Sequence, residues 1–96
     1  MPAIGMIEIQ GVTAAIDALD IMLKVADVRF LTWERKLGGR LVTVIIQGET
    51  AAVNEAVATA CMKAIRQPCA RLVLPNPHKE TIRIIQMSVA RGKYYE

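Results

Sequence analysis

The stretch VRFLTWERKLGGRLVTVIIQ, residues 28–47, decides the fold because it predicts two strands joined by a short turn. Its two outer parts, Val28 to Glu34 and Leu41 to Gln47, are rich in the β-branched and aromatic residues that favour strands. The middle part, Lys36 to Arg40, holds two adjacent glycines, which adopt positive φ without steric cost. Two strands this close in the chain are expected to pair as an antiparallel hairpin.

A strand and a helix are predicted before the hairpin. Ala3 to Gln10 alternates apolar and polar residues at its centre, which indicates a strand that ends at Gly11. The next segment is expected to be an amphipathic helix with Thr13 as its N-cap and its end near Ala26-Asp27. Its apolar residues recur three and four positions apart: Ile16, Leu19 and Leu23.

A second helix and a fourth strand are predicted after the hairpin. The helix opens at Gly48-Glu49-Thr50 and is expected to end at Pro68, because proline cannot continue the hydrogen-bond ladder. Its larger apolar residues recur every four positions: Val53, Val57, Cys61 and Ile65. Ala70 to Leu74 is the expected fourth strand, closed by Pro75-Asn76-Pro77-His78.

The remaining residues, 79–96, form a tail whose conformation the pattern leaves open. Ile82-Arg83-Ile84 alternates like a strand, whereas Ile82 and Ile85 suit a short helix. Terminal segments are disordered by default. Docking on a neighbouring subunit and contact with enclosed proteins are the other readings for its end, which carries Tyr94 and Tyr95.

The predicted order is therefore β-α-β-β-α-β followed by the tail. This is the split βαβ, or ferredoxin-like, order of the α+β class. It implies a four-stranded antiparallel sheet with two helices on one face. The expected division is a domain over residues 1–78 and a tail over 79–96 that either belongs to the same domain or is partly disordered. The order by itself does not fix function.

Composition argues against several classes of function. A chain of 96 residues is one domain on ordinary size priors. The net charge of +3 is mild and the basic residues are scattered, so no nucleic-acid partner is expected. No apolar run approaches the roughly 20 residues that span a bilayer, and the start of the chain does not resemble a signal peptide. We therefore expect no membrane partner and a cytoplasmic location.

The reactive side chains do not form a recognisable site. Cys61 and Cys69 make no CxxC motif, and the single histidine, His78, adds no metal spacing, so neither a metal nor another cofactor is expected. Cys61 has the helical spacing of a core residue. The candidate acids are spread over three predicted elements with no partner histidine except His78, and catalysis is not expected: Glu8, Asp17, Asp20 and Glu34.

Four local sequences, taken in order and in register, resemble the single-domain family of bacterial microcompartment shell hexamers over residues 4 to about 79. They are Ile4-Gly5-Met6-Ile7-Glu8 with Gly11, Ala14 to Asp20 with Met22, Lys24 and Ala26, Leu41 to Gly48, and Pro75-Asn76-Pro77-His78. The resemblance implies cyclic homohexamers that tile edge to edge into a flat layer around enclosed enzymes. It also implies other shell paralogues as neighbours, a small pore for polar metabolites on the six-fold axis, and no reaction catalysed by the subunit.

The resemblance assigns roles to two sets of residues. Lys36, Leu37, Gly38, Gly39 and Arg40 fall where the family has its pore loop. The glycines on their own are explained more simply by the hairpin turn, and the family register favours the pore loop. Lys24, Asn76 and His78 fall where hexamers meet at their edges.

Three departures from the family pattern are visible. Arg40 replaces a residue that is usually small, and it either narrows the pore and favours anions or lies on the outer face, which is the commoner place for arginine. Asn76 stands where the family often has arginine, which suggests weaker or redirected lateral contacts. The segment from Gly48 to Pro75 is about two residues shorter than usual.

Two alternatives remain at this stage. The first is a ferredoxin-like regulatory module that binds a small metabolite, although the turn from Leu37 to Arg40 is short and plain for an effector site. The second concerns Cys69, which is a candidate reactive thiol or cluster ligand only if six copies meet on an axis.

Overall fold

The computed structural model describes residues 2–92 and confirms the predicted order of strands and helices. The elements are β1 (Ala3–Ile9), α1 (Val12–Val25), β2 (Val28–Lys36), the 3-10 turn η1 (Leu37–Gly39), β3 (Leu41–Gly48), α2 (Thr50–Lys63), β4 (Ala70–Leu74) and α3 (Lys79–Gly92). No helix within these residues is long and apolar enough to cross a membrane.

The four strands form one sheet in the order β2-β3-β1-β4, and every neighbouring pair is antiparallel. This confirms the predicted hairpin, in which Val28 pairs with Gly48 and Lys36 with Leu41. The β2–β3 register shifts between Phe30 and Thr32, which marks a bulge. Because β2 and β4 lie at the two edges of the sheet, each has one side without a strand partner among residues 2–92.

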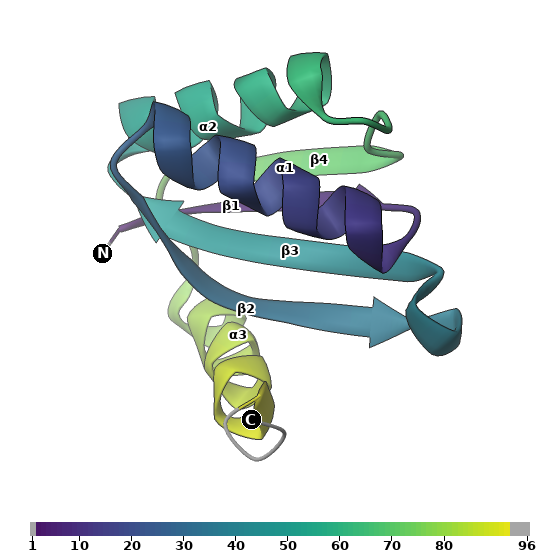
Figure 1. The fold of residues 1–96 in the computed structure, drawn as a ribbon. Helices are drawn as coiled ribbons and strands as arrows, with labels where there is room; N and C mark the ends of the chain where they lie inside the picture. Colours follow the sequence, from purple (N-terminus) through teal and green to yellow (C-terminus); the bar gives the residue numbers. More distant parts are fainter. Residues whose placement is uncertain (1, 93–96) are drawn as a thin grey trace.

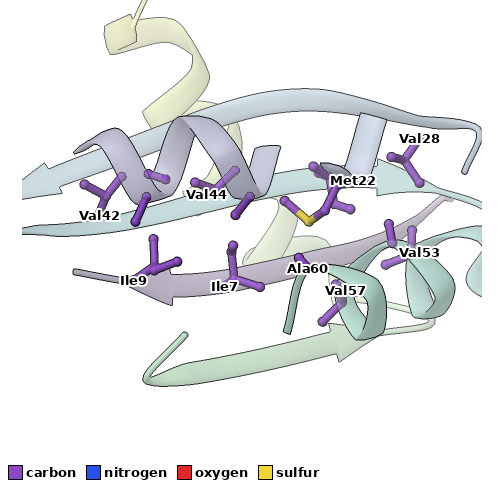
Figure 2. Close-up of a cluster of buried hydrophobic side chains, with 14 of the residues drawn as sticks. Ile7, Ile9, Met22, Val28, Val42, Val44, Val53, Val57 and Ala60 are labelled. Carbon is purple, nitrogen blue, oxygen red and sulfur yellow. The ribbon is translucent and has the colours of Figure 1, made fainter. Parts of the chain in front are cut away.

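The main core lies between the sheet and the helices α1 and α2, which cover one face together (Figure 1). Alternate residues of β1 and β3, such as Ile7 and Val44, point into this core because side chains alternate across a strand. Alanines and Met22 of α1 meet valines of α2 there, as Figure 2 shows for the larger side chains. The small alanine side chains let both helices lie close to the sheet, as the Ala-rich composition predicts.

The opposite face of the sheet carries α3 (Figure 1). A second, smaller cluster forms there around Ile4, Ile45 and Ile85, of which the last belongs to α3. The strand reading of residues 82–84 is therefore wrong: residues 79–92 form a helix that packs on β2. Residues 93–96, including Tyr94 and Tyr95, lie outside the described part of the chain, so the expectations for them are not addressed.

Two helix boundaries differ from the predictions. Thr13 is not a cap, since it lies inside α1 and the N-cap position is Gly11 at φ 95°. The helix α2 ends at Lys63 rather than at Pro68, because Ala64 has extended backbone angles. Ile65 consequently lies beyond the helix, where it is exposed and its N–H donates to Asp17 Oδ2 at 2.9 Å.

Candidate functional site

The loop between β2 and β3 has an unusual backbone. Leu37, Gly38 and Gly39 have φ angles of 55°, 68° and 88°. The glycines confirm the expected positive φ, whereas Leu37 was not predicted to adopt it, because a non-glycine residue does so only uncommonly. The Leu37 side chain is exposed. The turn therefore exposes the apolar side chain of Leu37, which lies between the end of β2 and the two glycines.

Arg40 closes this loop from its C-terminal side. Its backbone N–H donates to the Leu37 carbonyl oxygen at 3.3 Å, and its side-chain Nε donates to the same oxygen at 2.9 Å. The guanidinium is therefore folded back against the loop instead of extending away from it.

The loop is also fastened to the start of α1. The N–H of Gly11 donates to the Arg40 carbonyl oxygen at 3.1 Å. A Cβ added to Gly39 would lie 3.0 Å from Val12 Cγ2, so the chain passes closely there. The conformation of the loop is thus set by its neighbours as well as by its glycines.

Two basic side chains lie at the end of β2, next to the loop, on opposite faces of the sheet. Arg35 lies with its guanidinium carbon 5.5 Å from the centre of the Trp33 ring, an arrangement typical of a cation–π contact. Lys36 Nζ lies 3.9 Å from Glu34 Oε1. Both side chains are exposed, so they contribute positive charge to the surroundings of the loop.

The second set of predicted residues is exposed and locally bonded. Lys24 Nζ lies 2.8 Å from Asp20 Oδ2, and this hydrogen bond, with the charge of Asp20, raises the pKa of Lys24. Asn76 lies in the connection after β4. His78 precedes α3, where its Nδ1 accepts the N–H of Glu80 at 3.0 Å and its carbonyl oxygen accepts the N–H of Ile82 at 3.0 Å.

The structure separates the two predicted sets. The loop lies at the end of the sheet where β1 finishes, since Gly11 bonds Arg40. Lys24, in the last turn of α1, and Asn76, which follows β4, lie at the opposite end, where β1 begins and Ile4 pairs with Leu74 (Figure 1). The loop residues thus form one group, and Lys24, Asn76 and His78 share the other end, which we call the far end.

Both lateral edges of the domain expose apolar side chains. On one edge, Phe30 of β2 is 43% exposed, and Ile16 and Leu23 of α1 are also exposed. On the other, Leu72 of β4 is 47% exposed and lines a groove between β4 and α2 with Asn54. The two edges expose different residues on different elements, so they are two distinct apolar surfaces.

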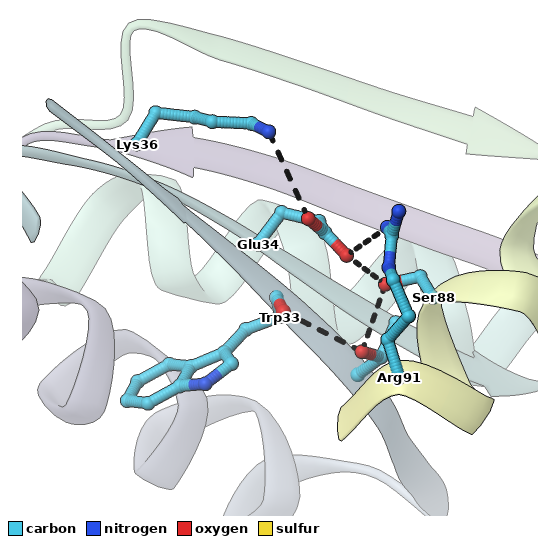
Figure 3. Close-up of polar contacts among 6 residues, drawn as sticks. Trp33, Glu34, Lys36, Ser88 and Arg91 are labelled. Atoms are coloured by element: carbon cyan, nitrogen blue, oxygen red, sulfur yellow. Dashed lines mark hydrogen bonds and ion pairs between the residues drawn. The ribbon is translucent and has the colours of Figure 1, made fainter. Parts of the chain in front are cut away.

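A polar cluster that the sequence did not predict joins α3 to β2 (Figure 3). The Ser88 hydroxyl donates to Glu34 Oε2 and shares a hydrogen bond of 3.0 Å with the Thr32 hydroxyl. Arg91 Nη2 donates to the same Glu34 oxygen at 2.7 Å. We call these residues, Thr32, Glu34, Ser88 and Arg91, the α3 clamp.

Electrostatics in the clamp favour the ionised form of Glu34. The hydrogen bond from Ser88 lowers the pKa of Glu34 most, and Arg91 and Lys36 lower it further, while partial burial opposes them. A weak signal for the clamp was present in the sequence, because Ser88 follows Ile85 at helical spacing and so shares its buried face. Its partner on β2 was not predictable, since the two residues are far apart in the chain.

The two thiols are in different environments. Cys61 is half-buried and packs against the main core, as predicted. Cys69 is exposed just before β4, where its Sγ lies 3.3 Å from the Glu8 carbonyl oxygen. Within residues 2–92 no three His, Cys, Asp and Glu side chains are grouped closely enough to hold a metal ion.

Comparison with known proteins agrees with the sequence resemblance. Residues 3–77 match the BMC domain family. The chain is 43% identical over 88 residues to the carboxysome shell protein CsoS1A of Hydrogenovibrio crunogenus, covering 88% of this chain and 91% of that one. It is 37% identical over 91 residues to the microcompartment shell protein PduA of Salmonella typhimurium, covering 93% and 96%. The chain therefore belongs to the BMC domain family.

A solved structure is similar as well. The crystal structure of a microcompartment protein from Desulfitobacterium hafniense DCB superposes with a TM-score of 0.77 at 31% identity. The match covers 92% of this chain and 48% of that one, so this chain spans about half the length of its structural neighbour. The predicted fold is confirmed by this likeness and by the sheet order.

Proposed function

We propose that this chain is a structural subunit of a bacterial microcompartment shell. In this proposal six copies form a ring whose central pore is lined by Lys36 to Arg40 and passes small polar metabolites. The rings tile through their far ends into a flat layer in the cytoplasm, beside other shell paralogues and around enclosed enzymes. The subunit itself catalyses no reaction.

The observation that carries this proposal is the position of the loop relative to the far end. A subunit of a flat ring needs one end on the axis and the opposite end on the rim. Leu37 to Gly39 lie at one end of the sheet, whereas Lys24 and Asn76 lie at the other. The names of the similar proteins, which describe carboxysome and microcompartment shell components, support the same role.

The lateral edges supply a second line of support. A ring forms when one surface of each copy binds a different surface of the next copy, and the rotation closes. The edge with Phe30, Ile16 and Leu23 and the edge with Leu72 are two different apolar surfaces on opposite sides of the domain. Their pairing between copies would remove exposed apolar area from water, which favours association.

The regulatory module gains no such support. An effector site needs several polar groups that converge on one ligand. In the described part of the loop, Arg40 Nε is already bonded to Leu37 and Lys36 lies near Glu34. The family membership of the chain favours the shell role instead.

Electron microscopy of purified protein tests the proposal. We expect flat layers for the wild-type protein and isolated rings for Lys24→Glu, because this change puts an acidic group at the far end. Lys63→Glu is the matched control, since Lys63 is an exposed lysine in the last turn of α2. This control is expected to form layers like the wild-type protein. Particles without six-fold rings, or equal loss of layers in both variants, would contradict the proposal.

A further inference from the structure

We propose that the C-terminal end of α2 is a docking surface for another protein, whose contacting segment carries acidic and apolar side chains. The surface consists of Met62, Ile65 and Arg66, and we call it the α2 patch. None of its residues belongs to the β2–β3 loop, to the far end or to the lateral edges that the proposed function uses. The inference concerns the surface of a single chain, so it does not depend on the ring.

Two large apolar side chains of the patch are almost fully in contact with solvent. Met62 is 82% exposed and Ile65 is 69% exposed, the two highest values among the large apolar residues of 2–92. Met62 points away from the sheet, because it lies opposite the buried side of α2 that contains Val57 and Ala60. A partner with apolar groups would remove both side chains from water, which favours binding.

The body of the domain holds Ile65 in place. Its backbone N–H donates to Asp17 Oδ2 of α1 at 2.9 Å, and the N–H of Ala64 donates to the Ala60 carbonyl oxygen at 3.0 Å. Ile65 is therefore fixed beside α1, and α1 and α2 lie side by side on one face of the sheet (Figure 1). A surface that is already ordered loses less entropy on binding than a mobile one.

The charge around the patch is positive and is not neutralised locally. Residues 56–79 contain four basic residues and no acidic residue: Lys63, Arg66, Arg71 and Lys79. In the part of the chain that the structure describes, no carboxylate lies within ion-pair distance of Arg66. The partner is therefore expected to bring acidic groups, which these basic side chains attract.

A second pair of exposed apolar residues has a different electrostatic setting. Ile84 and Met87 of α3 are also exposed. The neighbouring Arg83 pairs with Glu80 at 2.9 Å, and its Nη1 lies 3.8 Å from Met87 Sδ. The charge beside this pair is thus neutralised within α3, so the pair has no preference for an acidic partner. It supplies a matched control for the α2 patch.

The composition of the patch favours a protein over a lipid surface or a nucleic acid. The patch contains no aromatic residue, whereas helices that lie on membranes often carry one and single-stranded nucleic acids stack on them. Methionine and arginine are enriched in protein–protein interfaces, and methionine adapts to partners of different shape. Met62 and Arg66 supply both of these residue types.

Isothermal titration calorimetry tests the patch, on protein whose mass in solution has first been measured. The first probe is a soluble peptide built from Glu, Leu and Ala, and the second carries Lys in place of every Glu. We expect the wild-type protein to bind the acidic peptide at least about tenfold more tightly than the basic one. Vesicles of phosphatidylcholine with phosphatidylserine are the third probe, and we expect no binding to them.

Two double variants locate the binding surface. Met62→Ser with Ile65→Ser should weaken binding of the acidic peptide at least about tenfold, because both apolar contacts are lost. Ile84→Ser with Met87→Ser is the matched control and should bind this peptide as the wild-type protein does. All four side chains are exposed, so both variants are expected to fold, which circular dichroism checks.

The charge of Arg66 is tested separately. Arg66→Gln should weaken binding of the acidic peptide at least about threefold at low salt and less at high salt, because salt screens exposed charges. Arg29→Gln is the control, since Arg29 is an exposed arginine of β2 at a distance from α2 in the sheet order. This control should leave the affinity for the acidic peptide unchanged.

The outcomes separate the patch from the proposed ring. Hexamers that bind no acidic peptide, or that lose equal affinity in the two double variants, would overturn the patch alone. Tighter binding to the vesicles than to the acidic peptide would overturn the protein partner in favour of lipid. A monomer that binds the acidic peptide through Met62 and Ile65 would support the patch and contradict the ring.

Discussion

Arg91 Nη2 on α3 lies 2.7 Å from Glu34 Oε2 on β2, so an ion pair joins segments that are 57 residues apart in the chain. The same carboxylate oxygen accepts the Ser88 hydroxyl. On the same face of the sheet, Ile85 of α3 packs with Ile4 and Ile45. The helix α3 is thus held to the sheet by one polar cluster and one small apolar cluster, whereas α1 and α2 share the larger core.

The α3 clamp predicts a specific pH dependence of stability. The folded protein holds the pKa of Glu34 below its usual value of 4.5, first through Ser88 and then through Arg91. The unfolded chain therefore binds protons more readily at this group, and stability rises with pH. The contribution of Glu34 is complete above the usual pKa and is lost as the pH falls through the lowered folded value.

We therefore expect the free energy of unfolding to fall more steeply below about pH 4.5 for the wild-type protein than for Glu34→Gln. Urea unfolding at several pH values and one protein concentration measures this, because oligomerisation makes stability depend on concentration. Glu55→Gln on exposed α2 surface is the control and should keep the wild-type slope. Equal slopes of unfolding free energy against pH for the wild-type protein and Glu34→Gln would show that the clamp does not lower the pKa of Glu34.

The buried hydroxyl of Ser88 gives a second prediction. Ser88→Ala removes the hydroxyl that bonds both Thr32 and Glu34, and leaves Glu34 only its contacts with Arg91 and Lys36. Because the lost bond to Glu34 involves a charged group, we expect a loss of about 1–3 kcal/mol in unfolding free energy. Thr59→Ala also removes a hydroxyl, but Thr59 is only half-buried and its hydroxyl donates to the Glu55 carbonyl oxygen within α2, so the expected change is within about 0.5 kcal/mol. Urea unfolding measures the loss in unfolding free energy for both variants. Equal losses would count against a stabilising role of the α3 clamp.

Two adjacent isoleucines on α3 provide a third prediction. Ile85 is 7% exposed and Ile84 is 57% exposed, although both belong to one helix. Ile85→Ala should cost about 2–5 kcal/mol and speed hydrogen exchange along α3, because it removes the apolar anchor of the helix. Ile84→Ala should change stability by less than about 0.5 kcal/mol. Similar exchange in the two variants would mean that Ile85 is not the anchor.

The glycines of the loop give a fourth prediction. A Cβ at Gly38 meets nothing within 4 Å, so Gly38→Ala should cost only the strain of positive φ, about 1–2 kcal/mol. A Cβ at Gly39 would also lie 3.0 Å from Val12 Cγ2, so Gly39→Ala should cost more. Thermal unfolding of both variants measures the order, and a larger loss for Gly38→Ala would contradict the close approach to α1.

Local signals in the sequence were sufficient for the hairpin and for the fold class. β-branched runs on both sides of Gly38 and Gly39 specify two strands and a turn, and proline and glycine mark the other boundaries. The end of α2 was missed because Ala64, where the helix ends, is a good helix former, and Pro68 was the only breaker nearby. The end is instead accompanied by a hydrogen bond from Ile65 to Asp17 of α1, which is a tertiary contact.

The helix α3 and the α3 clamp were likewise not predictable from the local sequence, because tertiary contacts specify them. Ile82-Arg83-Ile84 fits a strand and a helix equally well, and the helix is favoured by contacts with distant parts of the chain. Ile85 packs with Ile4 and Ile45, and Ser88 and Arg91 bond Glu34. The positive φ of Leu37 was also not predicted, since leucine adopts positive φ only uncommonly. Arg40 was recognised from sequence as a departure from the family, but its bond to Leu37 required coordinates.

The central claim is that the loops of six copies surround one axis. The most direct test is the mass of the wild-type protein in solution, measured by light scattering at several concentrations. We predict a particle of six times the 10.5 kDa chain mass, with larger flat assemblies as concentration rises. A monomer or a trimer at every concentration would contradict the account, because the loop would then have no axis to surround.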